Sequence, residues 1–195
     1  MLNRNKSIKE INQQKEYDMV IIGGGASGLG VALDAVSRGY KTLLVEKNDF
    51  GKGTSSRSTK LVHGGVRYLQ QGNVRLVKEA LKERSYLLLM ASHVSKVQAF
   101  IIPFYSRFTG AYYYAGLKSY DLLAGRQRIG KTQWLSKKEV IEQIPNIQPS
   151  NLKGGILYYD GQFDDARLCI DVVKTIAENG GTCINYVSAI GFEKK

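Results

Sequence analysis

The chain has 195 residues, 43% hydrophobic and 23% charged, which are the proportions of a globular protein with one good-sized core, or a domain and part of a second. Its two cysteines and two histidines exclude a disulfide framework and a zinc set, so no metal is expected and a reducing, cytoplasmic setting is favoured. The net charge of +11 favours phosphate ligands or an anionic membrane surface, whereas nucleic acid is not expected because no recognised binding module accompanies the charge.

The first elements predict a flexible tail and then a βαβ unit. Residues 1–16 are polar and lack the hydrophobic core of a secretory signal, so we expect a loose tail. Residues 17–22 (YDMVII) and 41–46 (KTLLVE) have the apolar composition of strands buried on both faces. Between them, residues 26–38 have helical spacing, and Gly39 stands where a helix usually ends. The predicted fold class is α/β, with a Rossmann-like parallel sheet.

A glycine motif lies between the first strand and its helix. The motif GGGASG begins at Gly23 and has the spacing G-x-G-x-x-G. Gly23 permits a tight turn, Gly25 lets the backbone approach a pyrophosphate, and Gly28 allows the helix to pack closely on the strand. The helix start, at Ala26 and Ser27, offers free N–H groups and the positive end of the helix dipole to phosphates. A glycine-rich loop without a ligand is the alternative, but the strand–helix context favours a dinucleotide site.

The second strand ends in an acid that completes this site. Glu46 lies 18 residues after Gly28, where its carboxylate can accept hydrogen bonds from the adenosine ribose hydroxyls, and Lys47 follows it. An acid at this place disfavours a 2′-phosphate and hence NADP. An NAD domain would supply its third strand soon afterwards, but here more than a hundred residues precede the next strand of this type, at 182–190. Such an interruption suggests an FAD protein with other elements inserted into its nucleotide domain.

The segment that follows is rich in glycine, hydroxyl groups and cations. Residues 53–69 read GTSSRSTKLVHGGVRYL, which suits a loop that wraps a pyrophosphate and a flavin edge with backbone and side-chain donors. A flexible polar linker is the alternative, but linkers do not carry so dense a mixture of apolar and cationic residues. Between Lys52 and Arg84 the chain has eight Lys and Arg against two Glu, and we interpret most of this charge as a solvated basic face.

The remaining elements follow in order. Residues 73–90 predict a helix with an apolar stripe, and residues 100–133 look irregular and aromatic. Ser136 predicts the N-cap of a helix to residue 143, with Glu139 completing a capping box. Further predictions are a strand at 155–159, a helix from Asp164 or Asp165 to about residue 178, and the strand at 182–190. The two aspartates are interpreted as helix caps rather than as a catalytic pair.

Three segments carry a resemblance to a known family. Residues 53–69 closely resemble a signature of FAD-dependent glycerol-3-phosphate dehydrogenases and the related α-glycerophosphate oxidases. Residues 22–39 (IGGGASGLGVALDAVSRG) resemble that family's first signature, and residues 159–168 (YDGQFDDARL) resemble a third stretch. The resemblance implies FAD as cofactor and hydride transfer from C2 of sn-glycerol 3-phosphate to flavin N5, which gives dihydroxyacetone phosphate. The electrons would pass to a membrane quinone in dehydrogenases or to oxygen in oxidases.

The resemblance also implies roles for residues and domains. His63 and Gly64 would lie near the isoalloxazine, and His63 is the candidate acid/base or electrostatic group, with a purely structural histidine as the equal alternative. Arg57 would bind a phosphate of cofactor or substrate, or lie on the surface. The residues expected to line the FAD are Thr54, Ser55, Lys60 and Leu61. The expected domains are a tail (1–16), the first part of an FAD domain (17–99), an inserted helical and irregular region (100–155) that begins an α+β substrate domain, and a return toward the FAD domain (156–195) in a chain that looks truncated.

Other interpretations stay open at the level of sequence. Another FAD-dependent oxidoreductase, such as an amine or amino-acid oxidase, would share the fold, and a truncated chain could bind nucleotide without activity. The aromatic residues 112–114, with Arg107, Lys118 and the basic segment 125–130, could form a membrane patch or belong to the substrate domain. The first of these would place the protein peripherally on the inner face of the cell membrane.

Overall fold

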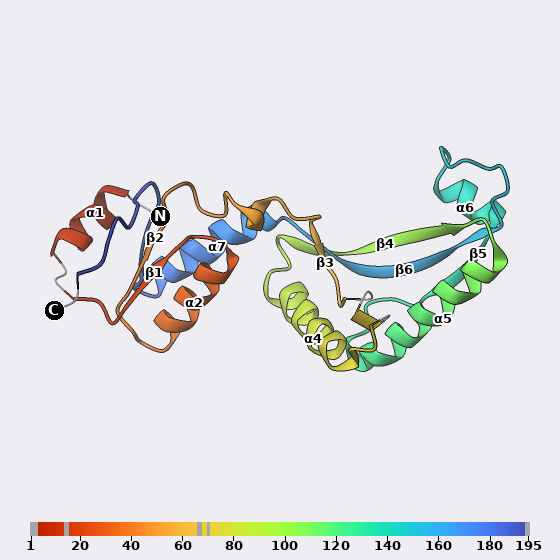
Figure 1. Cartoon of the computed structure of the whole chain (residues 1–195), viewed down its shortest axis with the longest axis horizontal. Helices are drawn as coiled ribbons and strands as arrows, with labels where there is room; N and C mark the ends of the chain where they lie inside the picture. Colours follow the sequence, from red (N-terminus) through yellow and green to blue (C-terminus); the bar gives the residue numbers. More distant parts are fainter. Residues whose placement is uncertain (1–3, 14–15, 66–67, 70, 194–195) are drawn as a thin grey trace. The chain divides into compact units, whose positions relative to one another are not determined.

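The computed structural model describes residues 4–13, 16–65, 68–69 and 71–193. The chain divides into two compact units (Figure 1), a first unit of Met1–Lys60 with Asp164–Lys195 and a second unit of Leu61–Phe163. This division differs from the predicted boundary at residue 99. Residues 61–99 lie before that boundary but belong to the second unit, because strands in this segment pair with β6 (Gly154–Phe163).

The first unit contains a three-stranded parallel sheet. Its strands are β1 (Met19–Ile22), β2 (Thr42–Val45) and β7 (Thr182–Ile184), in the order β1-β2-β7. Parallel neighbours need a crossover, which α2 (Ala26–Ser37) supplies between β1 and β2. The predicted βαβ unit and the late third strand are thus confirmed. The third strand is shorter than predicted, because Ile184 pairs with Val45, the last residue of β2.

The core of the first unit lies between its sheet and two helices. In Figure 1, α2 and α7 (Asp165–Glu178) lie side by side against the sheet. Leu29 and Val36 of α2 and Val173 and Ile176 of α7 meet there, with Leu44 of β2. The two cysteines, Cys169 and Cys183, are also buried in this core and are free thiols.

The prediction of a loose tail at residues 1–16 is wrong, because most of this segment forms a helix, α1 (Arg4–Gln13). Ile11 packs on Leu43 and Ile184 of the sheet, and Glu10 accepts a hydrogen bond from the Thr182 hydroxyl at 3.4 Å. The signal for this helix is weak, because Ile8 and Ile11 are its two apolar side chains and the rest are polar. Tertiary contact rather than local preference therefore stabilises it.

The second unit is an antiparallel sheet with helices packed on it. Its strands are β3 (Leu61–Val62), β4 (Ser95–Phe104), β5 (Gln133–Ser136) and β6, and its helices are α4 (Val74–Met90), α5 (Arg107–Ala124) and α6 (Lys137–Gln143). The strand β6 is central, because β4 pairs along its whole length and β3 and β5 pair with parts of it. Figure 1 shows α4 and α5 on the same side of β4 and β6.

Most of the region predicted to be irregular, residues 100–133, is instead regular structure. It contains the end of β4 and the 18-residue helix α5. Two glycines and three successive tyrosines lower the helix propensity of this stretch, so burial overrides local preference. The buried residues Gly110, Leu117, Tyr120 and Ala124 share one face of α5.

The predicted helix caps are found where the sequence placed them. Ser136 and Glu139 form the capping box of α6, and Asp164 caps α7 by accepting a hydrogen bond from the Arg167 N–H at 3.0 Å. Among the described helices, none is both long and apolar enough to cross a membrane.

Candidate dinucleotide site

The glycine turn has the geometry that the motif requires. Gly23 has φ +112° and donates its N–H to the Val45 carbonyl at 2.8 Å, which ties the turn to the end of β2. A Cβ on Gly28 would lie 2.0 Å from the Gly23 carbonyl oxygen, so only glycine lets α2 approach the turn this closely. The predicted structural reasons for these two glycines are confirmed.

The start of α2 is open toward ligand and meets one hydroxyl group. Gly25 is the N-cap and forms no side-chain cap, and Ala26 and Ser27 are exposed. The Ala26 N–H donates to the Ser55 hydroxyl at 2.8 Å, and a Cβ on Gly25 would meet only that oxygen, at 3.2 Å. The fold therefore brings Ser55 to the helix start, where it can share a phosphate oxygen with the first amides.

Glu46 lies at the end of β2, beside the glycine turn. Its carboxylate accepts hydrogen bonds from the N–H groups of Gly24 and Asn48, each at 2.7 Å. Burial alone would raise the pKa of Glu46, but these two hydrogen bonds outweigh it and hold the pKa below its ordinary value. Glu46 is thus ionised at neutral pH and lies directly after β2, and its contact with the ribose stays a prediction.

Gly24 is a residue whose importance the motif did not reveal. It is a variable position of G-x-G-x-x-G, yet a Cβ there would lie 2.9 Å from the Glu46 Cβ and 2.8 Å from the Phe50 ring. The glycine therefore lets Glu46 approach the turn. No local signal in the sequence distinguishes this requirement, because it comes from a residue 22 positions away.

An ion pair fixes the loop that carries Ser55. The loop contains the short 3₁₀ helix η1 (Thr54–Ser56), and Lys60, at φ +62°, pairs its ammonium with Asp165 and donates to the Ser56 carbonyl at 3.0 Å. Asp165 also accepts from the N–H and hydroxyl of Ser58, at 3.1 and 2.7 Å. Burial alone would raise the pKa of Asp165, but the bonds from Lys60 and Ser58 lower it to about 2.

Asp165 therefore anchors the loop to the first turn of α7, a role that the sequence did not predict. The sequence does contain one signal for this role. Of the two adjacent aspartates only Asp164 is needed as the helix cap, which leaves Asp165 for another contact. The ammonium of Lys60 is engaged by this anchor, so its expected contact with FAD stays a prediction. The side chains of Lys47, Thr54 and Arg57 are exposed, and their expected roles likewise stay predictions.

His63 and Gly64 belong to the second unit, directly after β3. The His63 side chain is exposed, and its Nδ1 accepts the Gly65 N–H at 3.1 Å, which leaves the proton of the neutral ring on Nε2. Gly64 is buried, and its N–H donates to the Tyr120 hydroxyl at 2.8 Å. Leu61, in β3, is half-buried. Residues 66–67 of the predicted signature segment lie outside the described part of the chain.

The first unit fits the adenosine diphosphate part of a dinucleotide. Amides at the start of α2 and the hydroxyl of Ser55 suit a pyrophosphate, and the ionised carboxylate of Glu46 suits ribose hydroxyls. A parallel βαβ unit with these glycines and this acid defines a dinucleotide-binding protein.

The family is given by comparison with known proteins. A family described as FAD dependent oxidoreductase matches residues 18–195. The chain belongs to this family, and the predictions of fold class and of FAD as the cofactor are confirmed.

Individual relatives have more specific names than the family. The chain is 45% identical over 200 residues to mitochondrial glycerol-3-phosphate dehydrogenase of Rattus norvegicus, covering 99% of this chain and 28% of that protein. It is 44% identical to the corresponding protein of Saccharomyces cerevisiae, covering 95% of this chain and 30% of that one. Among solved structures, glycerol-3-phosphate dehydrogenase from Bacillus halodurans complexed with FAD is similar at 34% identity with a TM-score of 0.72, over 98% of this chain and 30% of that chain. The resemblance predicted from the three segments is confirmed, and the chain spans less than a third of the length of these relatives.

Proposed function

We propose that this protein acts in the FAD-dependent oxidation of sn-glycerol 3-phosphate to dihydroxyacetone phosphate. The observation that carries the proposal is the identity of 45% with a glycerol-3-phosphate dehydrogenase over 99% of the chain. The geometry of the first unit supports it, because the glycine turn, Ser55 and Glu46 lie together in an arrangement that suits the nucleotide end of FAD.

The residues of this chain have separable tasks in that reaction. FAD, when bound, supplies the acceptor of the hydride. The Ser27 amide and the Ser55 hydroxyl, which accepts the Ala26 N–H, bind the pyrophosphate. Glu46 binds the ribose, so that the cofactor is held in one orientation. His63 is the acid/base or electrostatic candidate. Because its Nδ1 accepts the Gly65 N–H, the exposed Nε2–H can donate a hydrogen bond to the substrate oxygen and stabilise negative charge that develops there.

Flavin absorbance tests the proposed reaction. Anaerobic addition of glycerol 3-phosphate to the FAD-loaded protein should bleach the flavin, whereas an amino acid or amine should not. Bleaching by the amino acid, or by neither compound, would overturn the proposal. In the variant His63→Ala, FAD should stay bound while reduction slows by roughly a hundredfold or more, the usual effect of removing one donor to a developing negative charge. An unchanged rate would assign His63 a structural role.

We propose a quinone as the electron acceptor and peripheral contact with the inner face of the cell membrane. Support for the acceptor comes from the relatives, which are named dehydrogenases. Support for the contact comes from one face of α5, where Phe108, Tyr112 and Leu122 are 84, 58 and 80% exposed and Arg107 and Lys118 lie at the margin.

Vesicle binding tests the membrane contact. The variant Phe108→Ser with Leu122→Ser should lose sedimentation with vesicles rich in phosphatidylglycerol while it keeps its FAD. A matched control is Leu89→Ser with Met90→Ser, because these side chains of α4 are 77 and 80% exposed but lie on another helix. Equal binding by both variants would contradict the proposed surface.

A further inference from the structure

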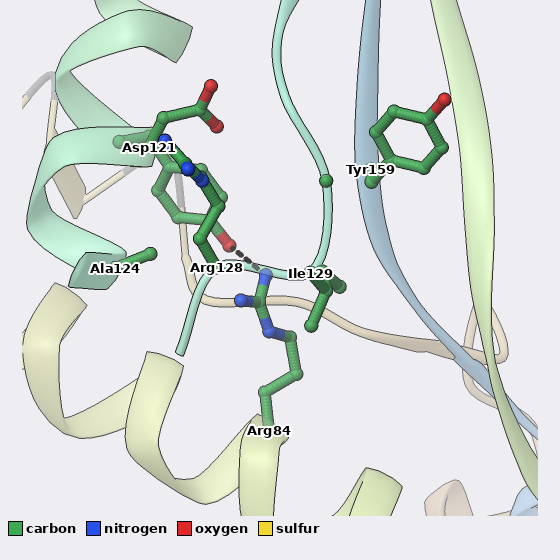
Figure 2. Close-up of a pocket in the computed structure, with 8 residues that line it drawn as sticks. Arg84, Asp121, Ala124, Arg128, Ile129 and Tyr159 are labelled. Atoms are coloured by element: carbon green, nitrogen blue, oxygen red, sulfur yellow. Dashed lines mark hydrogen bonds between the residues drawn. The ribbon is translucent and has the colours of Figure 1, made fainter. Parts of the chain in front are cut away.

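Three polar side chains form a buried cluster in the second unit. They are Arg84 of α4, Tyr120 of α5 and Asp160 of β6, which are 1, 3 and 3% exposed. Burial of a guanidinium and a carboxylate is costly unless each is paired and hydrogen-bonded. Figure 2 shows Arg84 extending from its helix toward the segment with Arg128 and Ile129.

The cluster fixes the position of one oxygen atom. Arg84 Nη1 donates to Asp160 Oδ1 at 2.9 Å and to the Tyr120 hydroxyl at 3.2 Å, and Nη2 donates to the Gln127 carbonyl at 3.0 Å. The Tyr120 hydroxyl in turn donates to Asp160 Oδ2 at 3.1 Å. Both oxygens of the carboxylate are thereby used, and the phenol is held from two sides.

The remaining bond of this oxygen leads to the segment after β3. The Tyr120 hydroxyl accepts the Gly64 N–H at 2.8 Å, a bond that is fully buried. A Cβ on Gly64 would lie 2.3 Å from that hydroxyl and 2.5 Å from Leu81 Cδ2, so the backbone is pressed against the cluster. On its other side the segment is fixed by the pairing of Val62 with Gly161, the neighbour of Asp160.

We propose that Tyr120, held by Asp160 and Arg84, is a positioning residue that sets the place and orientation of the His63 imidazole. Gly64 follows His63 directly, and the next amide, that of Gly65, donates to His63 Nδ1. A fixed Gly64 thus fixes both the backbone of His63 and the amide that orients its ring. The inference rests on the proposed function, in which the His63 Nε2–H donates a hydrogen bond to the substrate oxygen.

Removing a charge from the cluster does not test this role cleanly, because the other charge would be left buried and unpaired. Tyr120→Phe is the better variant, since it keeps the ring and removes only the hydroxyl. Tyr114→Phe is a matched control on the same helix, where the tyrosine ring packs on Trp134. If Tyr120→Phe does not fold, Arg84→Met with Asp160→Leu releases the phenol while it replaces the ion pair by apolar groups.

Hydrogen exchange gives a readout that does not need substrate. In the FAD-loaded protein, Tyr120→Phe should accelerate amide exchange in the segment 61–65 by at least about tenfold, with the rest of the second unit nearly unchanged and with no such effect of Tyr114→Phe. Acceleration spread evenly over the unit, or none at residues 61–65, would overturn the inference and leave a general role in stability.

Flavin reduction gives the second readout. Tyr120→Phe should slow reduction by glycerol 3-phosphate roughly tenfold with little change in KM, because a misplaced group affects the chemical step. In the His63→Ala background the same substitution should change the rate less than about twofold, since both act on one group. Additive effects would overturn the inference. If glycerol 3-phosphate did not reduce the flavin of the wild-type protein, the proposed function would be refuted instead. The exchange measurement would still decide whether Tyr120 fixes the segment 61–65.

Discussion

Two glycines of α2 give a sharp test of the packing at the dinucleotide site. An Ala at either Gly28 or Gly30 gains about 1 kcal/mol of helix propensity, because both lie inside the helix. At Gly30 the new Cβ has nothing within 4 Å, so Gly30→Ala should stabilise the protein by up to about 1 kcal/mol. At Gly28 the Cβ would lie 2.0 Å from the Gly23 carbonyl oxygen and 3.1 Å from its carbon.

The clash at Gly28 is with backbone, so it cannot be relieved by rotating a side chain. An ordinary contact begins at 3.4 Å, so the helix and the turn must separate by more than an ångström. Overpacking of this kind costs about 1–3 kcal/mol or more, which exceeds the gain in propensity. Gly28→Ala should therefore lower the midpoint of thermal unfolding by several degrees and release FAD, while Gly30→Ala raises the midpoint slightly and keeps FAD.

Thermal unfolding followed by circular dichroism, together with the fluorescence of released flavin, measures both effects in one sample. Shifts of the same sign and size in the two variants would refute the reasoning. So would a Gly28→Ala protein that binds FAD as tightly as the wild type, because the turn would then be shown to yield without loss of the site.

Two further predictions concern carboxylates. Glu46→Gln should weaken FAD binding about ten- to a hundredfold, because it replaces hydrogen bonds to a charged group that contribute about 1.5–3 kcal/mol; Asp34→Asn, at an exposed acid paired with Arg38, is the control and should leave the Kd unchanged in a fluorescence titration. Asp165→Asn should cost about 1 kcal/mol at pH 7, taking the lowering of the pKa from 3.8 to about 2 and discounting it for the half-exposed Lys60. A pKa lowered by folding stabilises above the unfolded value, so the difference from the wild type in urea unfolding should be constant above about pH 4 and vanish as the pH falls toward 2; a difference that persists at pH 2 would contradict the anchor.

The parts of the fold that sequence predicts well depend on short-range physics. The glycine turn, the capping box at Ser136 and the cap at Asp164 each join residues within a few positions, so their chemistry is visible in a short window. The third strand of the sheet was also predictable despite its distance, because an apolar run at 182 had to complete an α/β sheet.

Other features depend on partners far along the chain. Helix α1 has little amphipathic signal and is stabilised by contact with β2 and β7, and α5 forms in spite of two glycines because one face is buried. The anchor between Lys60 and Asp165 joins residues 105 positions apart, and the bond between Arg84 and Asp160 joins residues 76 apart. A local pattern cannot choose these partners, since many lysines and aspartates are equally suitable until the fold is known.

The glycines of the two signature segments are required for different structural reasons. Gly25 has open space around its Cα apart from Ser55, as expected where a ligand approaches the backbone, whereas Gly64 is enclosed by Tyr120 and Leu81. The resemblance to a family identified both residues but suggested ligand contact for each. The enclosure of Gly64 means that its place is imposed from within the second unit, by bonds that need no cofactor. The segment with His63 is therefore preorganised, and any cofactor or substrate that meets this imidazole meets it in a position already set by Tyr120.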